Sequence, residues 1–188
     1  RRIHGRHPIG AVPASAIQQM KAQLRSIVDE YLCSHDAAEV ARRLYELQLP
    51  LECEWLLVRV AVEVAIERRD ADREHVSRLL ANLAHRVLPQ RVVAQGFESL
   101  LERIDDLALD TPGADSILSA FLVRAIADDV LPPAFVWAGP AALHSHRQAA
   151  TLKQARTRLA ATHHGDANRH VWGRATGGTV DEMKKAMA

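Results

Sequence analysis

The stretch from Phe97 to Phe135, FESLLERIDDLALDTPGADSILSAFLVRAIADDVLPPAF, decides the fold. Apolar residues recur at steps of three and four on both sides of a short acidic turn, which predicts two amphipathic helices. The turn reads Asp-Asp-Leu-Ala-Leu-Asp-Thr-Pro over residues 105–112, and Pro132-Pro133 ends the second helix. Because a short connection forces neighbouring helices to run antiparallel, this stretch predicts a helical hairpin.

Four more helices are expected before this stretch. The apolar face of the first begins at Ile17, and Asp36 supplies N-cap chemistry for the second, which Pro50 ends. The segment from Leu51 to Arg69 is apolar on nearly all sides, and its β-branched residues would suit a strand. Its length favours a buried central helix instead, because strands usually stop near six residues. The fourth helix follows, and Pro89 opens the fifth.

Six helices joined by tight turns form three hairpins, which must stack in order to bury their apolar faces. The repeat of about 38 residues lies in the range of HEAT-type helical repeats. The sequence therefore predicts an all-α fold of stacked antiparallel helical hairpins.

Composition limits the classes of function. The chain has 188 residues, 48% of them hydrophobic, and a formal net charge of +1, which argues against a dedicated nucleic-acid binder. No apolar run approaches the ~20 residues of a membrane span, so no membrane partner is expected. Cys33 and Cys53 form no CxxC pair, and free thiols are expected more than an isolated disulfide.

Changes of composition along the chain suggest four segments. Residues 1–14 are expected to be a linker, and 15–137 the helical domain. Residues 138–178 are expected to be a second linker that carries a weak surface helix over 143–161. A capping box, Thr-Val-Asp-Glu, opens residues 179–188, which are expected to begin the first helix of a following domain. Because the chain lacks an initiator Met, we expect it to be part of a longer protein.

Acidic residues recur near the C-terminal ends of the expected helices, where the helix macrodipole disfavours them. They are Asp29, Glu30, Glu67, Asp105 and Asp106, with Asp110 one short turn later. In stacked hairpins these ends lie along one edge, so the acids could form an acidic binding edge. They could equally be solvated surface charges paired with nearby arginines, and Asp110 could cap the Thr111-Pro112 turn.

The acidic turn and the final hairpin resemble those of an MA3 domain, and the resemblance covers roughly residues 17–135. The Leu-Ala-Leu-Asp-Thr-Pro hexamer at 107–112 is similar to the programmed-cell-death-4 branch of that family, whose members are tandem-MA3 translation regulators. The resemblance implies an atypical HEAT-like fold. It also implies a parent protein with a following MA3 domain, located in the cytoplasm and, as a second site, in the nucleus.

The same resemblance implies a binding function that involves no catalysis. MA3 domains of this branch bind the DEAD-box RNA helicase initiation factor 4A and restrain translation initiation. By position, Glu30, Glu67, Asp106 and Asp110 match the acids that contact basic residues of the helicase. The alternative is a module like that of the initiation factor 4G scaffold, which recruits the helicase productively.

Catalytic and metal chemistry find little support in the sequence. There is no Gly-x-Ser-x-Gly motif and no P-loop, so we expect no enzyme activity and no cofactor. The histidines at 144, 146, 163, 164 and 170 fit no structural-zinc spacing, and no metal is expected. Asp128-Asp129 is expected to be an acidic helix end and not a catalytic pair.

RNA binding remains a weaker alternative. The basic segments 1–7 and 146–170 could contact phosphates, but Trp172 is the one aromatic residue near them, and stacking on bases is poorly supported. The competing interpretation is a solvated linker in which Trp172 anchors the chain on a neighbouring domain. In MA3 proteins a Trp-Gly followed by Gly-rich sequence separates tandem domains, and Trp172-Gly173 resembles that pattern.

Overall fold

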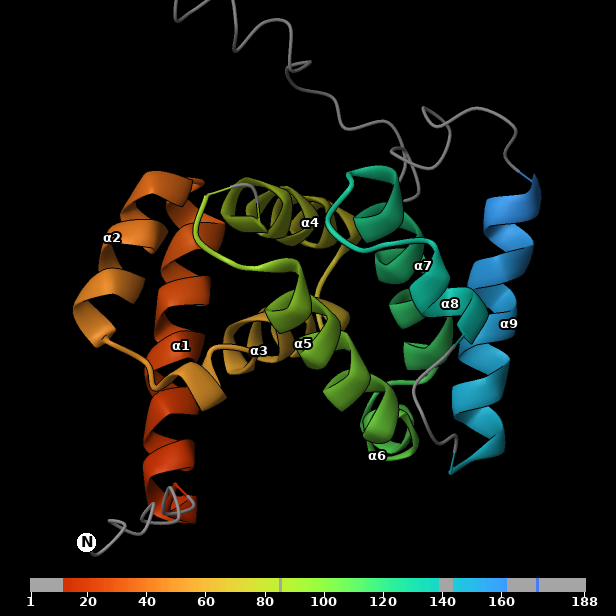
Figure 1. The fold of residues 1–188 in the computed structure, drawn as a ribbon, viewed down its shortest axis with the longest axis horizontal. Coiled ribbons are helices and arrows are strands. Elements are labelled where there is room, and N and C mark those ends of the chain that lie inside the picture. Colours follow the sequence, from red (N-terminus) through yellow and green to blue (C-terminus); the bar gives the residue numbers. More distant parts are fainter. Residues whose placement is uncertain (1–11, 85, 139–143, 162–171, 173–188) are drawn as a thin grey trace, which may run out of the picture.

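The computed structural model describes residues 12–84, 86–138, 144–161 and 172, and these residues form only helices and turns (Figure 1). The all-α class predicted from the sequence is confirmed. The elements are α1 (Ala14–Ser34), α2 (Ala37–Leu47), the 3₁₀ turn η1 (Leu51–Cys53), α3 (Leu56–Ile66), α4 (Asp70–Ala84), α5 (Gln90–Glu102), α6 (Ile104–Asp110), α7 (Ala114–Ala127), α8 (Ala134–Ala138) and α9 (His146–Ala161).

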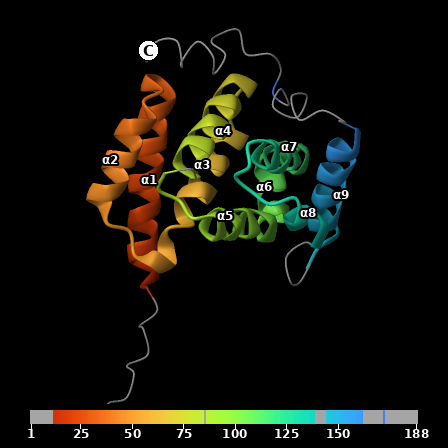
Figure 2. The same ribbon diagram turned by 45° about the horizontal axis from the view of Figure 1, so that its top comes forward.

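The helices are arranged in layers along the chain. Helices α1 and α2 form one flank, α3, α4 and α5 occupy the middle, and α7, α8 and α9 form the other flank (Figures 1 and 2). Helix α1 packs on α2 and α3, α3 packs on α4, and α7 packs on α9. Consecutive layers therefore share one hydrophobic core.

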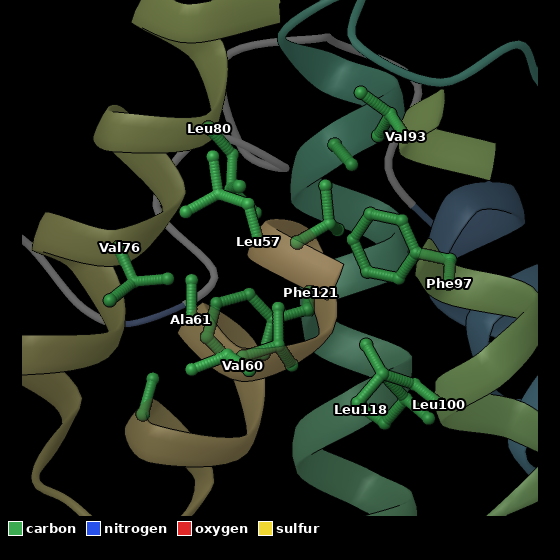
Figure 3. Packing of buried hydrophobic residues seen from close by; sticks show 14 of the residues in the cluster. Leu57, Val60, Ala61, Val76, Leu80, Val93, Phe97, Leu100, Leu118 and Phe121 are labelled. Atoms are coloured by element: carbon green, nitrogen blue, oxygen red, sulfur yellow. The ribbon is translucent and has the colours of Figure 1, made fainter. Parts of the chain in front are cut away.

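Helix α3 is the centre of that core. Every residue of α3 is buried except Glu63, and α1, α4, α5 and α7 all pack against it. Figure 3 shows side chains from α3, α4, α5 and α7 pointing toward one another, among them Leu57, Val76, Phe97 and Phe121. A helix that is apolar on all sides must be buried, and the prediction of a central helix and not a strand is confirmed.

The helix ends follow signals present in the sequence. The Asp36 carboxylate accepts hydrogen bonds from the backbone N–H groups of Ala38 (2.9 Å) and Glu39 (3.0 Å) and caps α2, as predicted. Helix α1 ends where His35 takes a left-handed conformation with φ of 58°. The His35 ring stacks on His75 of α4, with 3.7 Å between the ring centroids, and joins the end of α1 to α4.

Two segments differ from expectation. Residues 105–110, expected to belong to a turn, are part of the short helix α6, because the apolar residues Ile104, Leu107 and Ala108 give even this short segment a core-facing stripe. The helix expected over 143–161 is not a weak surface helix. It is α9, and it packs closely on α7, burying a stripe that consists of Gln148, Thr151, Leu152 and Ala155.

The remaining expectations on chain organisation concern residues 1–11, 162–171 and 173–188, which lie outside the described residues. The division of the chain into linkers and domains therefore stays a prediction.

Both cysteines are free, as expected; Cys33 is exposed and Cys53 is buried.

The close approach of α5 to α3 yields a test of the core. A Cβ at Gly96 would lie 2.5 Å from Cβ of Val58 and 3.1 Å from the carbonyl oxygen of Trp55. We expect Gly96→Ala to destabilise the fold by roughly 1–3 kcal/mol, because the added methyl overpacks this contact. Urea unfolding would measure the loss. Gln95→Ala, at the neighbouring exposed position, is the control and should change stability little; equal stability of both variants would contradict the described packing.

Candidate protein-interaction site

The four acids predicted to bind a partner are all exposed, on three different helices. Glu30 lies in the last turns of α1, Glu67 is the C-cap residue of α3, Asp106 is in the first turn of α6, and Asp110 is the last residue of α6. Residues far apart in sequence are thus brought to the outside of consecutive layers.

Ion pairs join the α1 and α3 members of this set. Arg25 of α1 donates to Glu67 at 3.2 Å, and Asp29 of α1 accepts from Arg68 at 2.6 Å. Glu30 pairs with Arg43 of α2. All of these side chains are at least partly exposed, so each pair contributes about 0–1 kcal/mol. Glu30 and Glu67 are therefore already engaged with arginines of this chain.

A second group of charges connects α3 to α6. Glu63 accepts from Arg59 at 2.8 Å and lies 3.5 Å from Nε of Arg103, between α5 and α6. Arg103 in turn lies 3.8 Å from Asp106. Because Glu63 is one helical turn before Glu67, the two groups of charges are contiguous. We call the set of Glu30, Arg43, Arg25, Glu67, Glu63, Arg103, Asp106 and Asp110 the charged edge.

The charged edge differs from the purely acidic edge that the sequence suggested. Arginines are interspersed among the acids, and Asp110 is the member that forms no ion pair with any residue the structure describes. The expectation that Asp105 and Asp106 end a helix is also wrong. They lie in the first turn of α6, where the macrodipole favours carboxylates, because the chain starts a new helix at Arg103.

Helix α6 presents one further residue that the sequence reading did not single out. Leu109 is 84% exposed, between Asp106 and Asp110. The sequence pattern could have indicated its exposure, because Ile104, Leu107 and Ala108 share the core-facing stripe of α6 and Leu109 falls outside that stripe. An exposed apolar side chain beside two carboxylates provides an apolar contact within a charged surface.

A cleft of about 150 Å³ opens between α1 and α2 next to Glu30. Ile27, Tyr31 and Val40 form its apolar floor, and the charged side chains at its rim are Glu30, Asp36, Glu39 and Arg43. The Tyr31 hydroxyl donates to the carbonyl of His75 at 3.0 Å. Burial raises the pKa of Tyr31 to about 12.

The described residues show no candidate metal site. They contain no group of three or more His, Cys, Asp or Glu side chains placed to hold a metal ion. Of the histidines considered for a metal, those at 163, 164 and 170 lie outside the described part of the chain. Asp128 is half-buried and accepts from Arg124 at 2.7 Å at the end of α7. None of the helices described is long and apolar enough to cross a bilayer.

Comparison with known proteins agrees with this architecture. The model of the MA3 domain family matches residues 20–132, and the chain belongs to this family. It is similar to MA3 domain-containing translation regulatory factor 3 of Arabidopsis thaliana, with 34% identity over 96% of this chain and 26% of that protein. It is also similar to programmed cell death protein 4 of Gallus gallus, with 30% identity over 86% of this chain and 34% of that protein. The chain thus spans about a quarter to a third of the length of these relatives.

The buried Tyr31 phenol of α1 should make the stability of the fold depend on pH in the alkaline range. Its pKa is raised from 10.0 to about 12 in the fold, so the neutral phenol is favoured there. The stability this contributes is fully present below pH 10 and is lost as the pH rises through 12, by roughly 2 kcal/mol. We expect Tyr31→Phe to cost about 1 kcal/mol near neutral pH and to remove this alkaline loss.

Urea unfolding at several alkaline pH values would measure the difference. Tyr45→Phe, at an exposed position of α2, is the matched control and should follow the wild-type profile. If Tyr31→Phe lost stability with pH as steeply as the wild type, burial of the phenol would not be the cause.

Proposed function

We propose that this MA3 domain is a protein-interaction domain of a translation regulator and that it binds the DEAD-box helicase initiation factor 4A. Glu30, Glu67, Asp106 and Asp110 of the charged edge would contact basic residues of the helicase. The observation that carries the proposal is the pair Asp106 and Asp110, exposed one turn apart on α6, with no described residue paired to Asp110. Membership of the MA3 family and the names of its relatives support the regulatory role.

The ion pairs already present on the edge suggest how a partner would bind. A helicase arginine can join Asp110 without breaking an existing pair, whereas at Glu30 or Glu67 it must share the carboxylate with Arg43 or Arg25. Binding would therefore begin at α6 and extend toward α1. Complementary charge of this kind mainly sets the association rate and the choice of partner, and it weakens as salt is added.

Leu109 adds an apolar contact to this surface. Interfaces depend most on a few side chains that become fully desolvated, surrounded by polar contacts of lower energy. Leu109, next to Asp110 and one turn from Asp106, is placed for that role once a partner covers α6.

The biological outcome of binding would be restraint of translation initiation, in the cytoplasm and, as a second location, in the nucleus. The domain would act without catalysis, by holding the two lobes of the helicase in an inactive arrangement or by blocking RNA. The alternative is productive recruitment of the helicase, as by a scaffold of the initiation factor 4G type. The following MA3 domain expected in the parent protein would add avidity.

RNA binding through the basic segments is the less favoured alternative, because the arginines of α9 take up contacts within the domain. Arg147 lies 3.4 Å from Asp105, Arg156 donates to the carbonyl of Val136 at 2.6 Å, and Arg158 donates to Ser116 at 2.8 Å. A phosphate would have to compete with these contacts.

Neutralising α6 is the direct test of the proposal. We expect Asp106→Asn combined with Asp110→Asn to weaken binding of purified initiation factor 4A on the order of tenfold or more, because both charges lie at the first point of contact. Calorimetric titration at about 0.05 and 0.15 M salt would measure the affinity and its salt dependence.

A double variant that removes the same charge elsewhere is the control. Glu52→Gln with Asp129→Asn changes one exposed acid of η1 and one after α7, and the left-handed conformation of Asp129 suits asparagine. This control should bind as the wild type does. Equal binding by all three proteins would exclude α6 as the contact, and absence of binding by the wild type would overturn the proposed partner.

The two outcomes of binding separate in an RNA-unwinding assay. If the domain restrains the helicase, saturating domain should lower the unwinding rate several-fold. The Asp106/Asp110 variant should leave the rate unchanged. An unchanged or raised rate with bound wild-type domain would favour productive recruitment instead.

A further inference from the structure

Trp172 occupies a defined place on the domain although it lies 40 residues beyond the region matched to the MA3 family. Its indole packs against Phe121 of α7, with 4.7 Å between ring centroids and an angle of 57° between ring planes. Its Nε1–H donates to the Ser77 hydroxyl of α4 at 3.0 Å, across 95 residues of sequence. The Arg73 guanidinium lies 5.8 Å from the indole centroid.

The side chains that receive the indole are themselves fixed. Ser77 is 5% exposed and Phe121 is 1% exposed. Arg73 is held by the end of α3, because its guanidinium donates to the carbonyls of Ala65 (3.3 Å) and Ile66 (3.0 Å). It also pairs with Asp70 at 2.6 Å. The receiving surface is therefore built by core packing and by α3, and not by the segment that carries Trp172.

The hollow continues beyond the indole. Ser77 and Phe121, which contact Trp172, also line a small recess with Leu80, Ala125 and Val130. We call Arg73, Ser77, Leu80, Phe121, Ala125 and Val130 the α4–α7 hollow. Its elements are an aromatic face, one hydrogen-bond acceptor, one cation and an apolar recess.

These elements suit an indole. A tryptophan offers a large π face, which attracts an aromatic partner and a cation, and a single N–H donor at the ring edge. Phenylalanine could stack on Phe121 but has no donor for Ser77. A leucine would supply neither interaction.

We propose that the α4–α7 hollow is a recognition site for a tryptophan side chain and that Trp172 of the same chain fills it. The tether makes this an intramolecular contact, for which the effective concentration is in the millimolar range, so modest contacts suffice to hold it. A tryptophan-bearing segment of another protein could enter only by displacing Trp172. The site involves none of the charged-edge residues, and it is independent of the helicase proposal.

The indole N–H signals of the intact chain test this proposal. The three tryptophans give three such signals in a ¹H–¹⁵N spectrum, and Trp172→Ala identifies one of them by its loss. We expect the Trp172 N–H to exchange with solvent on the order of tenfold more slowly than that of Trp137, which is exposed. Ser77→Ala and the conservative core variant Phe121→Leu should each speed its exchange, whereas Tyr45→Phe, far from the hollow in sequence, should not.

A peptide with the sequence of residues 168–178 tests recognition in trans. At millimolar concentration it should shift the amide signals of Ser77 and Phe121 clearly more in the Trp172→Ala chain than in the wild type, where Trp172 competes for the hollow. The same peptide with alanine for tryptophan should shift neither.

Several results would overturn the proposal. One is Trp172 exchange as fast as that of Trp137, and another is slow exchange that Ser77→Ala and Phe121→Leu leave unchanged. Equal peptide-induced shifts in both chains would show that Trp172 does not occupy the hollow. Absence of shifts in the Trp172→Ala chain would show that the hollow does not recognise tryptophan.

Discussion

The burial of α3 on all of its sides is the constraint from which the rest of the domain follows. Four helices pack around it, and each turns an apolar face inward because α3 is apolar apart from Arg59 and Glu63. Gly96 lets α5 approach Val58 without a side chain between the two helices. The β-branched residues of α3 have no strong intrinsic preference for a helix, so tertiary packing and not local propensity holds this segment.

The position of the charges is a consequence of this packing. Because the sides of α3 are covered, its charged residues are limited to Arg59, Glu63 and those at its C-terminal end, where they pair with residues of α1 and with Arg103. The resulting ion pairs tie neighbouring layers together, but each is exposed and weak. Weak pairs can be exchanged for those of a partner at small cost, so a surface that helps to align the layers can also serve for recognition.

Features that depend on neighbouring residues could be predicted from the sequence, and those that depend on distant residues could not. The six main helices follow from apolar periodicity, and their ends follow from Asp36, Pro50 and Pro89. The burial of α9 depends on α7 as its partner, and the sequence of α9 alone resembles that of a surface helix. The exposed acids were found, and arginines near them, Arg68 among them, were expected to pair with some of them. The pair of Arg25 with Glu67, 42 residues apart, was not predicted. The choice of four acids as contact residues came from the resemblance to MA3 domains, because apolar periodicity gives no information about a partner.

Arg103 follows the last residue of α5 and precedes the first residue of α6. Because α6 is a separate helix, it has its own macrodipole. The partial positive charge at the start of a helix offsets Asp105 and Asp106, whereas the partial negative charge at its end adds to Asp110. Over the seven residues of α6, about 10 Å of helix, the negative potential therefore increases toward Asp110. A cationic group approaching this helix experiences a field gradient along its axis as well as an attraction. Such a gradient orients the incoming group before any contact forms.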